Sequence, residues 1–155
     1  VTMAKAIANG MPVGAVWATD EVAACFGPGD HGSTYAGQPL ALSAARATLA
    51  ALEEMDAPAV VAAKEQVLRA LLAELPGVDH VRGRGLLLGI ELTPDALAGR
   101  TGPDVARACL DRGLILNGIT PTALRVAPPY TITHEHLAEG VGVIAAVLAD
   151  RPEEA

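Results

Sequence analysis

The chain carries a lysine whose surroundings could support covalent chemistry. Lys5 lies among alanine, methionine and isoleucine, and no carboxylate occurs in residues 1–19 to hold its ammonium group as an ion pair. An unprotonated lysine amine forms a Schiff base with an aldehyde. A solvated surface lysine is the alternative from local composition alone, because most lysines in proteins are exposed.

A hydroxyl-rich turn follows at Gly32-Ser33-Thr34, within residues 31–40. Two hydroxyls and closely spaced backbone N–H groups suit a phosphate group. The same residue types also make ordinary tight turns, so the tripeptide alone leaves both interpretations open. A ligand that carries an aldehyde and a phosphate would use Lys5 and this turn together, and pyridoxal phosphate is such a ligand.

The family resemblance is carried by four sequence blocks. Residues 5–15, 31–41, 81–92 and 124–133, in this order and spacing, resemble the class III pyridoxal-phosphate-dependent aminotransferases, and the resemblance extends from residue 1 to about residue 149. It implies an α/β fold that forms the C-terminal part of a fold-type I transferase. Residues 1–55 would end the cofactor-binding large domain, residues 56–150 would form the small α+β C-terminal domain, and residues 151–155 would be a disordered tail.

The resemblance also implies roles for four residues. Lys5 would bond the cofactor and move a proton during the reaction, and Thr34 would hold the phosphate, reaching into the partner's site in a homodimer. Ser33 is a weaker candidate for the same phosphate. Arg125 would bind the α-carboxylate of the substrate, for which a bidentate guanidinium is physically suited.

The implied reaction moves the terminal amino group of N-acetylornithine to 2-oxoglutarate, in arginine biosynthesis. Ornithine, 4-aminobutyrate, succinylornithine and succinyldiaminopimelate are alternative donors, and a non-catalytic remnant or dimerisation module is an alternative of another class. The acidic residue that pairs with the cofactor ring in this family cannot lie in the four residues before Lys5. We therefore expect this chain to be a C-terminal portion that is inactive by itself.

Two departures from the family pattern occur near the proposed site. The glycine cluster after the lysine is reduced to Ala8-Asn9-Gly10, and Gly-Gly-Asn-Pro becomes Ala36-Gly37-Gln38-Pro39. The first change places asparagine where a positive φ could be required, and asparagine tolerates that conformation better than most side chains.

Composition excludes several other functions. The 155 residues have a formal net charge of -7 and a pI near 4.9, which argues against a nucleic-acid surface. No apolar run approaches the roughly twenty residues of a membrane helix. Cys25 and Cys109 match no metal spacing, and we expect two reduced thiols in a cytoplasmic protein without a metal site. His134 and His136, two apart on an expected helix, face different directions and predict a helix start rather than a metal pair.

The elements that must position these residues follow from hydrophobic spacing and breakers. A helix from Pro39 to Met55 should bury Leu40, Leu42, Ala45, Leu49 and Leu52. The Gly83-Arg84-Gly85 segment should be a turn into a buried strand, with Arg82 and Arg84 as an ion-pair rim. The other expected elements are a strand at 13–18, a helix start at Thr19, a helix at 57–75, a break at Pro76-Gly77, strands through Val81 and at 86–92, a helix at 103–112 that Gly113 ends, strands at 114–116 and 123–126, and a helix at 134–148 capped by Thr133.

Overall fold

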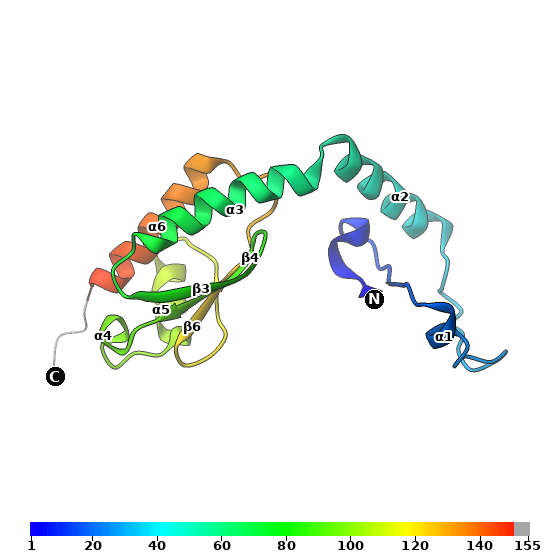
Figure 1. The fold of residues 1–155 in the computed structure, drawn as a ribbon, viewed down its shortest axis with the longest axis horizontal. Coiled ribbons are helices and arrows are strands. Elements are labelled where there is room, and N and C mark those ends of the chain that lie inside the picture. The colour runs from blue at the N-terminus through cyan, green and yellow to red at the C-terminus, as the bar shows by residue number, and fades with distance from the viewer. Residues whose placement is uncertain (151–155) are drawn as a thin grey trace. The chain divides into compact units, whose positions relative to one another are not determined.

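The computed structural model describes residues 1–150 and divides the chain into two compact units (Figure 1). The first unit comprises Val1–Ala57, and the second begins at Pro58. The tail expected at residues 151–155 lies outside the described residues. The described secondary structure mixes helices with strands, in agreement with the expected α/β class.

The first unit starts with a closed loop that contains the lysine. Strands β1 (Thr2–Met3) and β2 (Ala15–Val16) pair antiparallel, and between them the 3-10 helix η1 spans Lys5–Ala8. The strand expected at 13–18 is therefore shorter, because β1 offers only two residues to pair with. Helix α1 (Asp20–Ala23) begins after Thr19 as expected.

Helix α2 (Pro39–Glu54) confirms the helix expected here, but of the five residues predicted to be buried only Ala45 is buried. Leu40, Leu42 and Leu49 are exposed, whereas Ala41 and Ala45 are buried. Ala41 and Ala45 are four residues apart and so share one side of the helix. The helix packs on η1, where Ala8 is also buried. Small side chains allow this close approach. Burial was predicted for Leu40, Leu42 and Leu49 because they are large and apolar, but the side of α2 that contacts η1 carries alanines.

The second unit contains a four-stranded antiparallel sheet with the strand order β3-β4-β6-β5. Its strands are β3 (Val78–Arg84), β4 (Leu87–Leu92), β5 (Asn117–Gly118) and β6 (Ala123–Val126). The strands expected through Val81, at 86–92 and at 123–126 are confirmed, but the strand expected at 114–116 is wrong. Leu114 instead completes the end of a helix by donating its N–H to the Cys109 carbonyl at 2.9 Å.

Four helices accompany the sheet: α3 (Ala57–Ala73), α4 (Pro94–Leu97), α5 (Gly102–Asp111) and α6 (His134–Ala149). Thr133 caps α6 as predicted, because its hydroxyl accepts the His136 N–H at 3.1 Å. Gly113, with φ of +83°, ends α5 as expected. The short helix α4 was not predicted. Within residues 1–150, no helix combines the length and the apolar character needed to cross a membrane.

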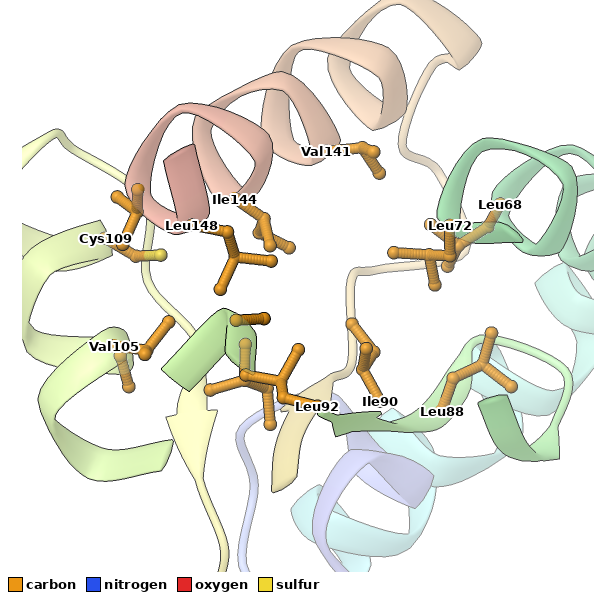
Figure 2. Close-up of a cluster of buried hydrophobic side chains, with 14 of the residues drawn as sticks. Leu68, Leu72, Leu88, Ile90, Leu92, Val105, Cys109, Val141, Ile144 and Leu148 are labelled. Atoms are coloured by element: carbon orange, nitrogen blue, oxygen red, sulfur yellow. The ribbon is translucent and has the colours of Figure 1, made fainter. Parts of the chain in front are cut away.

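The core of the second unit lies between the sheet and helices α3, α5 and α6 (Figure 2). Alternate residues of β4, namely Leu88, Ile90 and Leu92, are buried against these helices. Strand geometry then places Gly89 and Glu91 on the opposite face of the sheet, because successive side chains alternate. That opposite face carries polar residues, and it also carries the candidate substrate arginine.

A polar clamp fixes α3 to the turn between β3 and β4. Glu65 accepts the Gly85 N–H at 2.7 Å and an Arg69 N–H at 2.8 Å. Arg69 also donates to the carbonyls of Val81 and Gly83, at 3.1 and 2.7 Å. Gly83 and Gly85 have positive φ values of 119° and 60°, as the predicted glycine turn requires.

We expect Glu65→Gln to remove an acid-sensitive part of the stability of the second unit. Hydrogen bonds from Arg69 and Gly85 hold the pKa of Glu65 below its ordinary value of 4.5. A lowered folded-state pKa stabilises the fold above the unfolded-state pKa, and this contribution is lost as pH falls through the folded-state pKa. Thermal unfolding of the wild type and of Glu65→Gln should be measured from pH 7 downward. The wild type should be the more stable protein at pH 7, and this difference in stability should disappear as the pH falls below 4.5. A pH-independent difference would contradict the assignment.

Candidate functional site

Lys5 begins η1 in an unusual backbone conformation. Its φ is 57°, in the left-handed region that residues with a side chain seldom adopt. Asn9, at the end of η1, has φ of 46°, and Gly10 has φ of 106°. The positive φ anticipated at Asn9 is therefore confirmed. Backbone strain of this kind persists where surrounding structure imposes it, and it concentrates at functional sites.

A cavity of about 500 Å³ adjoins the lysine loop. Lys5 is exposed, and among residues 1–150 its amine forms no ion pair with a carboxylate. The lining comes from the loop that β1 and β2 close: Lys5, Ala6, Asn9, Gly10, Met11, Pro12 and Val13. A primary amine at an open, otherwise uncharged cavity fits the amine that pyridoxal phosphate requires.

The Gly32-Ser33-Thr34 turn is exposed on the same unit. Ser33 Oγ accepts the Tyr35 N–H at 3.3 Å, so its own O–H can donate to another group. In the described part of the chain, no hydrogen bond occupies the Thr34 hydroxyl, and none joins Lys5 to either residue. Both hydroxyls therefore fit a phosphate group. His31, just before the turn, packs edge-on against Phe26 with ring centroids 5.2 Å apart.

Arg125 lies on β6 in the second unit, on the sheet face opposite the core. Its cross-strand partners are Gly89 on β4 and Asn117 on β5. Its Nη2 donates to Asn117 Oδ1 at 2.9 Å, and the side chain is otherwise exposed. Pro128 and Pro129 follow the strand after Ala127 and restrict the backbone there. The structure thus places Lys5, Ser33 and Thr34 in one unit, without a hydrogen bond between the lysine and the two hydroxyl residues, and places Arg125 in the other.

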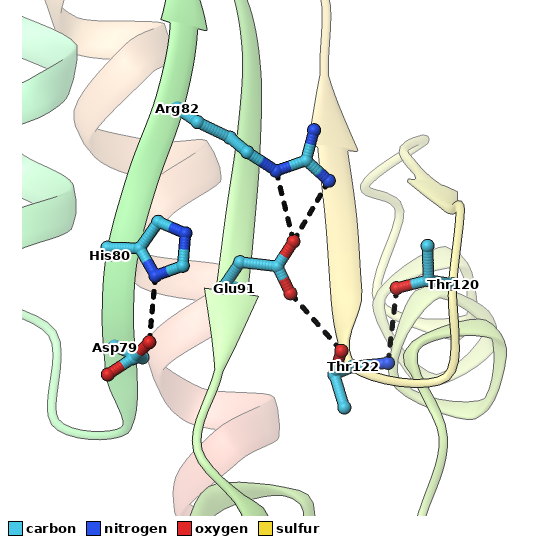
Figure 3. A network of polar contacts seen from close by, with 6 residues as sticks. All are labelled: Asp79, His80, Arg82, Glu91, Thr120 and Thr122. Carbon is cyan, nitrogen blue, oxygen red and sulfur yellow. Dashed lines mark hydrogen bonds and ion pairs between the residues drawn. The ribbon is translucent and has the colours of Figure 1, made fainter.

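The same sheet face carries a second arginine that forms an ion pair (Figure 3). Arg82 directs Nε and Nη2 to Glu91 Oε1 at 3.1 and 2.9 Å, and Thr122 donates to the other Glu91 oxygen at 3.2 Å. These contacts keep the pKa of Glu91 low. The ion pair predicted for Arg82 is confirmed, with Glu91 as its partner, whereas Arg84 forms no ion pair with a carboxylate of residues 1–150. A side chain at Gly89 would meet Arg82, since an added Cβ would lie 3.4 Å from Cγ and Cζ of Arg82.

Next to Arg125 lies a cavity of about 390 Å³. Its lining is mostly apolar and comes from α3, α6 and the chain around β5 and β6, with Asn117, Arg125 and His136 as the residues that carry polar side chains. Binding pockets for small molecules are commonly apolar with a few polar groups. His134 and His136 occupy the first turn of α6, as expected for a helix start.

Sequence reasoning missed Asn117 as a neighbour of Arg125. The two residues are eight positions apart and become adjacent only through the β5–β6 pairing. The strand expected at 114–116 would have excluded Asn117. An Asn-Gly pair is a hairpin-turn signal, but here the pair forms strand β5, so that signal would have placed Asn117 in a turn.

Comparisons with known proteins agree with this description of fold and residues. The family model "Aminotransferase class-III" matches residues 1–148. The chain is 41% identical over 150 residues to acetylornithine aminotransferase of Corynebacterium efficiens, which covers 97% of this chain and 36% of that protein. The chain therefore spans little more than a third of the length of this curated relative.

Solved structures give the same result. The chain resembles N-acetylornithine aminotransferase from Stenotrophomonas maltophilia with a TM-score of 0.77 and 34% identity, covering 96% of this chain and 38% of the other. Ornithine delta-aminotransferase of Plasmodium falciparum matches with a TM-score of 0.77 and 31% identity, again over 96% and 38%. By the extent of the family match and the shared α/β fold, this chain belongs to the class-III aminotransferase family.

Proposed function

We propose that this chain carries the cofactor-linked lysine and a substrate-binding arginine of a pyridoxal-phosphate-dependent aminotransferase. The observation that carries the proposal is the Lys5 loop, where an exposed amine in a left-handed backbone conformation adjoins an open cavity. Family membership supports it independently, because the family match begins before this loop and extends through Arg125.

Each residue has a role that its chemistry supports. Pyridoxal phosphate, when bound, supplies an aldehyde that exchanges amines and a ring that accepts electron density. Lys5 would hold the aldehyde through its amine, and would later move a proton between the substrate carbon that bears the amino group and the aldehyde carbon of the cofactor. Ser33 and Thr34 donate their hydroxyl hydrogens to the phosphate oxygens.

Arg125 binds the substrate carboxylate through paired N–H donors. A guanidinium matches a carboxylate in plane and spacing, so it fixes the direction of the substrate as well as attracting it. A fixed substrate direction also fixes the direction of the C–H bond that must break. We propose amino and oxo acids as the substrate class for this reason.

The proposed donor is N-acetylornithine and the proposed acceptor is 2-oxoglutarate, in arginine biosynthesis. The names of the Corynebacterium and Stenotrophomonas relatives support this choice, and the Plasmodium relative supports ornithine as the alternative. We further propose a cytoplasmic homodimer in which Thr34 contacts the phosphate of the partner's site. The free thiols of Cys25 and Cys109 support a reducing compartment.

The test measures glutamate formed from 2-oxoglutarate by the chain fused to the part of the Corynebacterium relative that the match leaves uncovered. With pyridoxal phosphate present, we expect the fusion to form glutamate fastest with N-acetylornithine. Ornithine, 4-aminobutyrate, succinylornithine and succinyldiaminopimelate are the comparison donors. A fusion that binds the cofactor but uses none of the five contradicts the proposed function, and a monomer in sedimentation contradicts the proposed homodimer.

A further inference from the structure

Arg125 has one side-chain neighbour across the sheet. Of its two register partners, Gly89 contributes no side chain and Asn117 contributes an amide. The amide oxygen Oδ1 accepts from Arg125 Nη2 at 2.9 Å. A guanidinium has only donors, so the oxygen of the amide must face it and the amide NH₂ must face elsewhere.

The side-chain partner of Arg125 differs in charge from the side-chain partners of three other arginines. Arg69, Arg82 and Arg112 form ion pairs with Glu65, Glu91 and Asp150. Among residues 1–150, the side-chain partner of Arg125 is a neutral amide. In the sheet row of Arg125, Arg82 lies across Gly89, and the charge of Arg82 is paired with Glu91 (Figure 3). The positive charge of Arg125 is therefore oriented without being compensated.

We propose that Asn117 is the positioning residue for Arg125, an inference that rests on the proposed function of Arg125 as the carboxylate-binding group. Asn117 holds one edge of the guanidinium by a hydrogen bond and leaves its charge for the carboxylate of an amino or oxo acid. The amide NH₂ of Asn117 is a second donor available to the same carboxylate.

Two substitutions separate this role from a structural one. Asn117→Ala removes the hydrogen bond, and because the pair is exposed, we expect about threefold weaker carboxylate binding. Asn117→Asp keeps an acceptor for Nη2 but forms an ion pair with Arg125 and repels an anionic ligand. We expect about tenfold weaker binding for this variant, with thermal stability equal to that of the wild type.

The experiment titrates the wild-type chain and each variant with 2-oxoglutarate, while NMR follows the Arg125 side-chain N–H signal. Arg125→Ala is the control for the proposed function, with protein backbone signals as the readout. The rotation rate of the Arg125 guanidinium is also measured by NMR without ligand. We expect this rate to be higher in Asn117→Ala than in the wild type. Thermal unfolding of every variant shows whether the fold is retained.

The possible outcomes distinguish the two proposals. Failure of the wild type to bind 2-oxoglutarate, or full binding by Arg125→Ala, overturns the proposed function and this inference with it. Binding that is lost in Arg125→Ala but unchanged in Asn117→Asp overturns this inference alone. An Arg125 guanidinium that rotates equally fast with and without Asn117 also overturns it. Weaker 2-oxoglutarate binding by Asn117→Asp at unchanged thermal stability supports the inference. A structural role of Asn117 would lower the thermal stability as well as the affinity.

Discussion

Alanine in place of Lys5 will abolish specific covalent trapping of pyridoxal phosphate by this chain. The chain offers an unusually simple test, because Lys5 and Lys64 are its only lysines. Lys64 is half-buried and donates to the Tyr130 carbonyl, whereas Lys5 is exposed beside its cavity. An amine held at the aldehyde reacts at a high effective concentration, so Lys5 should take nearly all of the label.

The measurement is borohydride reduction of the cofactor-treated chain, followed by peptide mapping. We expect the label on Lys5 to exceed that on Lys64 by at least about tenfold, and Lys5→Ala to reduce labelling to background. Lys5→Arg should fail equally, because a guanidinium stays protonated and cannot react. Lys64→Arg is the matched control and should label normally. Equal labelling of the two lysines, or labelling that survives in Lys5→Ala, would remove the central support of the proposed function.

The second large effect is expected at Gly118, where two backbone segments meet. A Cβ added there would lie 2.3 Å from the Pro103 nitrogen and 2.4 Å from the Gly102 carbonyl carbon. Backbone atoms cannot move aside as the end of a side chain can, so Gly118→Ala must displace β5 from the start of α5. We expect a loss of about 3 kcal/mol in the free energy of unfolding, at the upper end of what overpacking usually costs.

Urea unfolding followed by circular dichroism measures this loss, and Gly142→Ala is its matched control. Gly142 is exposed on α6 with nothing within 4 Å of an added Cβ, so alanine should stabilise the helix by about 0.5–1 kcal/mol. Opposite signs for the two substitutions would confirm the close contact between β5 and α5. Unchanged stability of Gly118→Ala would show that the two segments are not held this close together.

The sequence predicted the parts of the fold that depend on local spacing and breakers. Helices α2, α3, α5 and α6 follow periodic apolar positions, and the caps at Thr133 and Gly113 follow residue chemistry. The buried face of α2 could not be predicted in full, because it depends on packing against η1, which is distant in sequence. Helix amphipathicity alone favours the leucine side.

The residues of the candidate site also include some that the sequence could identify and one that it could not. Lys5, Ser33, Thr34 and Arg125 were identified by residue type and resemblance, and their roles stay predictions. Asn117 could not be identified, because its relation to Arg125 exists only in the strand pairing of β5 with β6. The positive φ of Asn9 could be predicted, since a local backbone requirement selects asparagine or glycine directly.

Strand β5 consists of Asn117 followed by Gly118, and this pair makes the arginine site subject to chemical ageing. In an Asn-Gly sequence the glycine nitrogen can attack the asparagine amide, releasing ammonia, and hydrolysis of the ring leaves aspartate or isoaspartate. Asparagine is for such reasons a thermolabile residue. Deamidation at this position would place a negative charge directly beside Arg125 without any change in the gene. The age of a preparation, which intact mass and charge heterogeneity can monitor, therefore becomes a variable in any measurement of carboxylate affinity.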